Sequence, residues 1–210
     1  MQILSRQASV TIEVVVISMA LGTIVGLFAG LAKLSGSRTL RGISSVYVQL
    51  WRGTPLLVQL LWIYFGLPLV LGINFSPKVA GCFGLSLWAG AYLSELFRGG
   101  IVSIPLTQRN AGYTLGMTFT QVTTRIVLPQ AFQRILPPYI SQLIQVVKYS
   151  ALLSVIGVFE ITRRAETLVT ATFRPFEVYM ATAMVYFVIL FALAQLGKYA
   201  EKRLRVNVLE

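Results

Sequence analysis

The chain has 210 residues, of which 56% are hydrophobic and only 12% are charged, and its mean hydropathy is +0.74. So little charge cannot solvate the surface of a water-soluble globule, and the composition therefore predicts a membrane protein. The net charge of +11 could suggest nucleic acid, but its distribution favours membrane topology and attraction to anionic lipid. Cys82 is the single cysteine and histidine is absent, which argues against an internal disulfide, a zinc site or any other metal or cofactor centre.

Five windows are long and apolar enough to cross a bilayer core, which needs about 20 helical residues. They cover residues 10–33, 45–72, 79–97, 135–161 and 176–197. Because five helices use up the chain, we expect one transmembrane domain over residues 1–210. The first window is too long for a signal-peptide core and only Arg6 precedes it, so we expect it to be a retained span. Eleven cytoplasmic against five outer Lys and Arg residues predict an N-out, C-in orientation.

The first two windows carry distinct patterns. Small residues recur every four positions in the first window and predict a close packing face, made of Gly22, Gly26 and Gly30. In the second window, Gly53 and Pro55 are expected to bend the helix around Arg52. If that helix ran straight, one arc would carry Ser45, Gln49, Arg52 and Gln59. Arg52 could line a passage, or it could reach the interface and bind lipid phosphate.

The later windows add one ion pair and one polar stripe. Glu95 and Arg98 are three residues apart and are predicted to form an intrahelical ion pair. The fourth window is expected to break near Pro137 and Pro138, and its polar arc consists of Ser141, Gln142, Gln145, Lys148 and Tyr149. Such an arc either joins helices or lines a passage, and Lys148, nearly mid-span, favours the passage. Residues 162–177 are expected to form an outer loop with both signs of charge.

The polar stretch 103–129 is helix-like and lies between two spans. Ser103 and Pro105 are helix start signals, and Gly116 is suited to the left-handed position that ends a helix. Thr118 and Gln121 then have the spacing of a capping box for a second helix.

Further residues shape that second helix. Met117 and Val122 occupy the positions of a hydrophobic staple, and Pro129 limits how far the helix runs before the chain re-enters the membrane. Arg109 and Arg125 keep the segment on the cytoplasmic side. The local chemistry therefore predicts a stiff helix–turn–helix outside the membrane.

Several segments together resemble one known family. They are WRGTPLLVQL at 51–60, SELFRGG at 94–100, SIPLTQRNAGYTLGM followed by IVLPQAF within 103–132, and KYSALLSVIGVFEI at 148–161. In this order they resemble the permease subunits of polar amino acid ABC importers, in the histidine/glutamine/arginine group. The resemblance implies the type I ABC importer fold: an all-α integral membrane domain of five spans in the bacterial cytoplasmic (inner) membrane, with a cytoplasmic helix–turn–helix coupling element.

The family's coupling loop docks into a groove on an ATPase subunit. The resemblance places the ATPase-coupling role on Asn110, Ala111, Gly112, Gly116, Leu128 and Pro129, and of these Gly116, Leu128 and Pro129 match the family's loop. Where the family has Glu-Ala-Ala, this chain has Asn110, Ala111 and Gly112, so an acidic contact is lost. An exposed glycine inside a helix also costs about 1 kcal/mol relative to alanine.

The resemblance also implies partners and a passage. The chain would form half of a permease dimer, with an identical or similar chain, and work with two ATPase subunits and an external solute-binding protein. The chain itself would not be an enzyme, since it contains no P-loop. The passage for the amino acid would be lined by Arg52, Thr54, Pro55, Gln59, Gln145, Lys148 and Tyr149.

Two other classes remain open on the residues alone. An ion-coupled secondary transporter would need carboxylates deep in the membrane, whereas Glu13, Glu95 and Glu160 lie nearer the ends of spans, and inverted repeats are not evident. A purely structural or assembly protein would leave the capped helix pair and Lys148 without a purpose.

Overall fold

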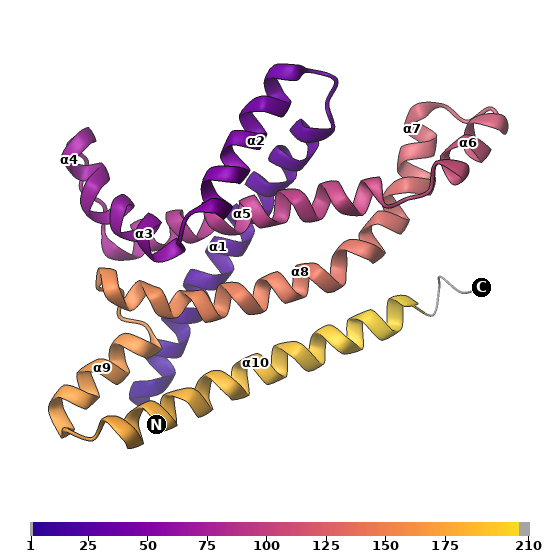
Figure 1. Cartoon of the computed structure of the whole chain (residues 1–210). Helices are drawn as coiled ribbons and strands as arrows, with labels where there is room; N and C mark the ends of the chain where they lie inside the picture. Colours follow the sequence, from indigo (N-terminus) through magenta and orange to yellow (C-terminus); the bar gives the residue numbers. More distant parts are fainter. Residues whose placement is uncertain (1, 206–210) are drawn as a thin grey trace.

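The computed structural model describes the backbone of residues 2–205 and the side chains of residues 7–202, and within this range every regular element is helical (Figure 1). The elements are α1 (Gln2–Leu34), α2 (Arg38–Gly53), α3 (Leu56–Leu61), a π-helical turn (Trp62–Gly66), α4 (Leu67–Leu71), α5 (Pro77–Val102), α6 (Leu106–Thr114), α7 (Phe119–Val122), a second π-helical turn (Thr123–Val127), α8 (Leu128–Ser150), a 3-10 turn (Ala151–Ile156), α9 (Ile161–Thr172) and α10 (Pro175–Arg205). The predicted all-α class is confirmed.

Four helical segments are long and apolar enough to cross a membrane: Gln7–Leu34, Pro77–Val102, Phe119–Ile156 and Pro175–Lys202. The remaining predicted span is a bent pair, Arg38–Gly53 and Leu56–Leu71, whose axes differ by 105°. The five windows therefore correspond to four helical spans and one broken segment.

The most extensive contact between two helices joins α1 to α5. A Cβ at Gly26 would lie 2.9 Å from the carbonyl oxygen of Gly90, and one at Gly30 would lie 2.8 Å from that of Ser94. The small-residue face of α1 thus lets the two backbones meet, as its spacing predicted. The Ser18 hydroxyl of α1 also donates to the Cys82 carbonyl of α5 at 3.4 Å, and α2 is joined to α5 by the Tyr47 hydroxyl, which donates to the carbonyl of Leu87 at 2.7 Å.

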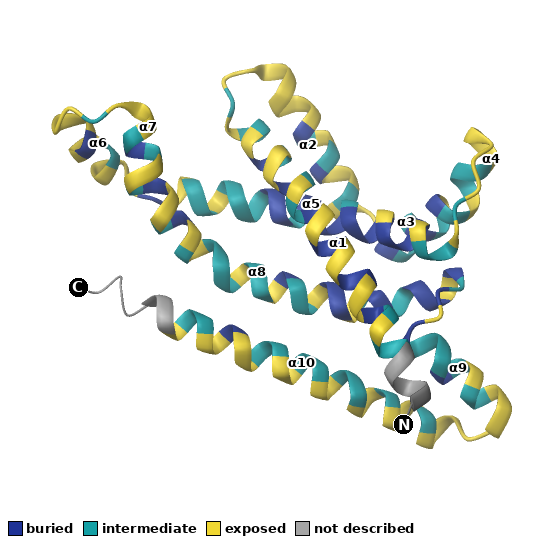
Figure 2. Cartoon of the chain, turned by 180° about the vertical axis from the view of Figure 1, so that it is seen from behind, coloured by how far each residue is buried: buried dark blue, intermediate teal, exposed yellow. Residues whose placement is uncertain are grey.

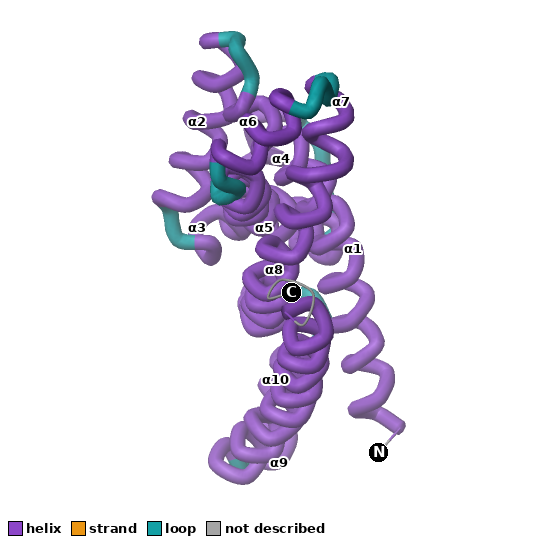
Figure 3. The backbone as a smooth tube through the Cα atoms, turned by 90° about the vertical axis from the view of Figure 1, so that its right-hand side faces the viewer, coloured by secondary structure: helices purple, strands orange, loops and turns teal. Residues whose placement is uncertain are grey.

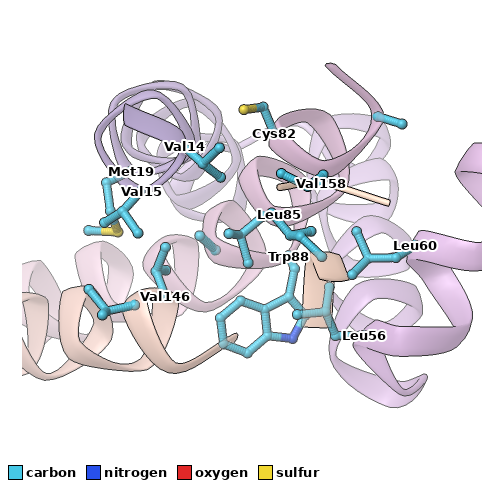
Figure 4. Close-up of a cluster of buried hydrophobic side chains, with 14 of the residues drawn as sticks. Val14, Val15, Met19, Leu56, Leu60, Cys82, Leu85, Trp88, Val146 and Val158 are labelled. Carbon is cyan, nitrogen blue, oxygen red and sulfur yellow. The ribbon is translucent and has the colours of Figure 1, made fainter. Parts of the chain in front are cut away.

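The apolar core lies where α1, α3, α5 and α8 meet (Figure 4). Leu60, Leu85 and Val146 are fully buried there, and the Trp88 ring fills the space beside Leu56. By contrast, α10 runs along α8 at the edge of the bundle, and its residues are almost all exposed or half-exposed (Figure 2). In a bilayer that outer side of α10 faces lipid.

The fourth span is longer than predicted. Its helix begins at Phe119, passes through a π-helical turn, and continues to Ser150 without a break at Pro137 or Pro138. The expectation that Pro129 would end the preceding helix is also wrong, because Pro129 follows the π-helical turn and lies in the first turn of α8.

Tertiary contacts explain why these prolines are tolerated. Ile135 packs directly against Gly100 of α5, and the Tyr139 hydroxyl hydrogen-bonds to Thr23 of α1 at 2.9 Å. Contacts on both sides of the prolines hold the segment helical, overriding local propensity.

At its far end the fourth span is shorter than predicted. The 3-10 turn stops at Ile156, and Gly157 adopts a left-handed conformation with φ 88°. The expected outer loop is also wrong, because most of residues 162–177 form α9, which begins after Glu160 and packs on α10 and α1. Figure 3 shows α9 beside one end of α10, far from α6 and α7.

Candidate functional site

The bend between α2 and α3 is made by two extended residues. Thr54 has φ −121° and ψ 148°, and Pro55 has φ −64° and ψ 133°. Pro55 lacks an N–H and disfavours a helical conformation at Thr54, so α2 must end at Gly53. The direction of the chain changes by 105° at this point.

Gln59 closes this bend from inside. Its Nε2 donates to the carbonyl oxygens of Trp51 at 3.0 Å and Thr54 at 3.1 Å, and to the Thr54 hydroxyl at 2.6 Å. These contacts satisfy carbonyls that the end of α2 leaves without helical partners. The straight-helix arc that joined Arg52 to Gln59 is therefore wrong, since the two residues lie on different arms of the bend.

Arg52 lies at one end of a row of side chains that connects three helices. Its guanidinium carbon is 4.8 Å from the centre of the Tyr92 ring of α5, a cation–π contact. The Tyr92 ring is 4.6 Å from that of Trp88, which is 4.7 Å, edge to face, from Tyr149 of α8. Two residues predicted to line the passage, Arg52 and Tyr149, are thus linked through two that were not, Trp88 and Tyr92. Trp88 and Tyr92 are four residues apart on a helix rich in small residues, and this spacing was the sequence pattern that could have indicated that their rings lie on one face.

The polar arc of α8 divides between two sides of the helix. Gln142 is buried and its Nε2 donates no hydrogen bond to any described residue, and Tyr149 is half-buried. Ser141, Gln145 and Lys148 are exposed. Among the described side chains Lys148 has no ion-pair partner. Because an ammonium group in contact with acyl chains is costly, this face of α8 must meet water or another protein surface.

The helix pair α6–α7 has the predicted capped turn. Gly116 has φ 77°, its N–H donates to the Tyr113 carbonyl, and the Met117 N–H donates to the Gly112 carbonyl, which is a Schellman ending. The Thr118 N–H then donates to the Gln121 side chain at 2.8 Å, and the Gln121 N–H donates to the Thr118 hydroxyl at 3.3 Å. The capping box is thus confirmed.

A small second core fixes this pair to the bundle. It consists of Ile104, Val122, Val127 and Ala131, with Met117, Ile101 and Ile135 packed against it. Gly112 is buried, and a Cβ there would lie 2.8 Å from Ile126 Cδ1 and 3.0 Å from Val122 Cγ2. The cost expected for an exposed glycine therefore does not apply, because α6 approaches Val122 and Ile126 at this position.

Two arginines hold the start of the pair. Arg109 Nη2 donates to the Ile101 carbonyl and Arg134 Nη1 to the Ser103 carbonyl, each at 2.6 Å. These carbonyls lie at the end of α5, where cationic donors are favourable. Ser103 therefore ends α5 rather than starting α6, and its hydroxyl donates to Gly100.

The tip of the pair presents apolar side chains to solvent. Leu115 is 82% exposed and Phe119 is 73% exposed, on either side of the Gly116 turn. Of the six residues predicted to couple to an ATPase, Gly112 is buried and the others, Asn110, Ala111, Gly116, Leu128 and Pro129, are exposed. Leu115 and Phe119 were not predicted to take part in coupling, and only their exposure in the folded chain identifies them as candidates.

Each of the three carboxylates that an ion-coupled mechanism would need has a partner. Glu13 pairs with Lys78 at 2.5 Å, and Glu95 pairs with Arg98 at 2.9 Å, as predicted, and also with Lys33 of α1. Glu160 caps α9 by accepting hydrogen bonds from its first N–H groups. Among the described residues no group of three His, Cys, Asp or Glu side chains could hold a metal ion.

Comparison with known proteins gives this arrangement a family. The family described as binding-protein-dependent transport system inner membrane component matches residues 22–206. The chain belongs to this family. Among curated members, the arginine transport system permease protein ArtQ of Bacillus subtilis is 36% identical over 199 residues, covering 95% of this chain and 91% of ArtQ. The glutamine transport system permease protein GlnP of Escherichia coli is 33% identical over 205 residues, covering 97% and 94%.

Solved structures of ABC transporters have the same fold. A crystal structure of an amino acid ABC transporter with histidines superposes with a TM-score of 0.91 at 34% identity, covering 95% of this chain and 93% of that one. An inward-facing MetNI methionine ABC transporter superposes with a TM-score of 0.78 at 18% identity, which supports the fold alone. The resemblance read from the segments at 51–60, 94–100, 103–132 and 148–161 is therefore confirmed as to family and fold.

Proposed function

We propose that this chain is the permease subunit of an ATP-driven ABC importer of polar amino acids in the bacterial cytoplasmic membrane. It pairs with an identical or similar permease and works with two ABC ATPase subunits and an external solute-binding protein. The observation that carries the proposal is the rigid helix pair α6–α7, which projects from the bundle and exposes Leu115 and Phe119 at its tip. The homology to permeases named for arginine and glutamine transport supports the substrate class.

The helix pair is the coupling element of this proposal. The Schellman ending, the capping box and the small core beneath it make the pair stiff, so a displacement imposed at the tip reaches α5 and α8. ATP binding by the partner biases the bundle towards one access state, and hydrolysis resets it. Because Asn110 carries no charge, docking relies on the apolar tip, with Leu128 and Pro129 at the base.

The passage for the amino acid runs past the bend at Thr54 and Pro55 and along the exposed face of α8. Arg52, on the aromatic row, and Lys148 supply positive charge that suits the carboxylate common to all amino acids. Gln145 supplies hydrogen bonds beside Lys148. In this arrangement Gln59 holds the bend in shape, and Tyr149 positions the α8 wall against Trp88.

The coupling role is tested by Gly116→Val in the reconstituted complex. A β-branched residue at φ 77° is strained, so the turn between α6 and α7 must change shape. We expect substrate-stimulated ATP hydrolysis and uptake to be lost while insertion and assembly remain normal. Gly36→Val, at a glycine with open space around it, is the control. Full stimulated hydrolysis in the Gly116 variant would refute the coupling role.

The passage is tested by uptake competition with a panel of amino acids, in the wild type and in Lys148→Ala. We expect polar amino acids to compete, and uptake by Lys148→Ala to fall at least tenfold with assembly intact. Lys198→Ala, an exposed lysine of α10, should transport normally. Uptake by the purified chain without any ATPase would instead support an ion-coupled transporter.

A further inference from the structure

A groove runs between α9 and the first turns of α10. It encloses about 250 Å³. Its walls are apolar and are formed by Ile161, Ala165, Leu168, Val178, Ala181 and Val185. The groove is distinct from the aromatic row and from the helix pair α6–α7, and the transport mechanism proposed above makes no use of it.

The walls of this groove are fixed by the chain reversal between the two helices. Phe173 ends α9 in a left-handed conformation with φ 54°, and its N–H donates to the Val169 carbonyl at 2.8 Å. This conformation is strained for a residue with a side chain. At the other end of α9, Glu160 accepts a hydrogen bond from Tyr186 of α10 at 2.9 Å. The two helices are therefore held apart at a defined spacing.

The groove lies at the membrane-facing edge of the bundle. The span Pro175–Lys202 contributes no buried residue in its most apolar window, so the side of α10 turned away from α8 is open to acyl chains. The groove occupies the end of α10 that is remote from α6 and α7 (Figure 1). Because the span begins there, the mouth of the groove is at the level of lipid headgroups.

Two opposite charges stand at that mouth. Arg174 and Glu177 both line the groove, and neither has an ion-pair partner among the described side chains. A zwitterionic headgroup is complementary to both, with its phosphate at the guanidinium and its ammonium at the carboxylate. An anionic headgroup would satisfy only Arg174 and would be repelled by Glu177.

We propose that this groove is a binding site for an aminophospholipid, with an acyl chain against the apolar walls and the headgroup held by Arg174 and Glu177. The lipid completes the outer surface of α10 and steadies α9. A primary ammonium group fits better than a quaternary one, because only the former donates hydrogen bonds to Glu177. Phosphatidylethanolamine is therefore preferred over phosphatidylcholine and phosphatidylglycerol.

The full-length chain, purified with its co-purifying partners, is equilibrated with equal amounts of phosphatidylethanolamine, phosphatidylcholine and phosphatidylglycerol. Native mass spectrometry then measures the lipids retained. We expect phosphatidylethanolamine to be retained preferentially by the wild type, and this preference to disappear in Ala181→Phe, which fills the groove. Ala183→Phe is the matched control, since Ala183 is exposed on the same helix but does not line the groove. Equal retention of the three lipids by the wild type, or an unchanged preference in Ala181→Phe, would overturn the proposal.

Charge variants separate the two headgroup contacts. Arg174→Gln should lower retention of all three phospholipids, and Glu177→Gln should lower only the preference for phosphatidylethanolamine, each by about threefold to fivefold, as for one surface charge pair. An Ala181→Phe variant that loses binding of the solute-binding protein but keeps its lipid would assign the groove to that protein instead. Lipid retention does not depend on ATP, so failure here is distinguishable from failure of the transport proposal.

Discussion

Replacing Glu160 by alanine should destabilise α9. The Glu160 carboxylate is fully buried and accepts hydrogen bonds from the N–H groups of Thr162 at 2.9 Å and Arg163 at 2.8 Å, and from the Tyr186 hydroxyl at 2.9 Å. Loss of an N-cap costs about 1 kcal/mol, and leaving buried donors unpaired costs about 1–3 kcal/mol. We therefore expect the free energy of opening α9 to fall by about 2–4 kcal/mol.

The same carboxylate makes α9 sensitive to pH. Glu160 lies between the spans Phe119–Ile156 and Pro175–Lys202, and burial raises its pKa above the ordinary value of 4.5, although hydrogen bonds from Thr162, Arg163 and Tyr186 oppose this shift. Because the pKa is raised, protonation of Glu160 favours the folded state over the unfolded one. This stabilisation by protonation is fully present below the unfolded pKa, and it is lost as the pH rises through the folded pKa. Glu160→Gln cannot ionise and should show no such loss.

Hydrogen exchange of the α9 amides in the purified complex measures both effects. At constant intrinsic exchange rate, a loss of about 2 kcal/mol corresponds to exchange about 30-fold faster in Glu160→Ala. Exchange in α6, which lies far from α9 (Figure 3), serves as the internal control. Unchanged α9 protection in Glu160→Ala, or parallel pH profiles for the wild type and Glu160→Gln after correction for intrinsic rates, would refute this reasoning.

Three further predictions concern packing, the aromatic row and docking. Gly26→Ala should lower the free energy of unfolding of the complex by about 1–3 kcal/mol, measured by thermal denaturation, because the added Cβ would lie 2.9 Å from a backbone oxygen. The control Gly42→Ala, at a helical glycine with open space around it, should raise stability by about 1 kcal/mol. Equal shifts in the two variants would contradict the close α1–α5 contact. Tyr92→Leu removes the ring beneath Arg52 and should raise the apparent KM for uptake about threefold or more. The control Tyr179→Leu, on α10, should leave the KM unchanged. An unchanged KM in Tyr92→Leu would show that the aromatic row does not line the passage. Leu115→Asp should weaken binding of the ATPase subunit to the permease by at least about tenfold in a titration, because it removes about 2 kcal/mol of apolar burial at the exposed tip. Unchanged affinity would exclude the tip as the docking surface.

Features that depend on neighbours in sequence were predictable. The capping box of Thr118 and Gln121, the left-handed Gly116 and the Glu95–Arg98 pair each need only residues one helical turn apart. The small-residue face of α1 was equally readable, because its period of four matches a helix whatever its partner. Apolar length alone indicated five segments, and four of them overlap helices long and apolar enough to cross a membrane, since a bilayer fixes how much helix is needed.

Tertiary structure decided which distant groups meet. That Gln59 closes a bend was not predicted, because the chain must first turn at Pro55 to bring the Gln59 amide onto carbonyls at the end of α2. The continuous helix through Pro137 depends on contacts with α1 and α5, and the burial of Gly112 depends on how α6 lies against Val122. The row from Arg52 to Tyr149 likewise needs three helices to pack together. Local sequence encodes hydrogen bonds within a turn or two of helix, whereas these contacts arise only when separate helices bury their faces against each other.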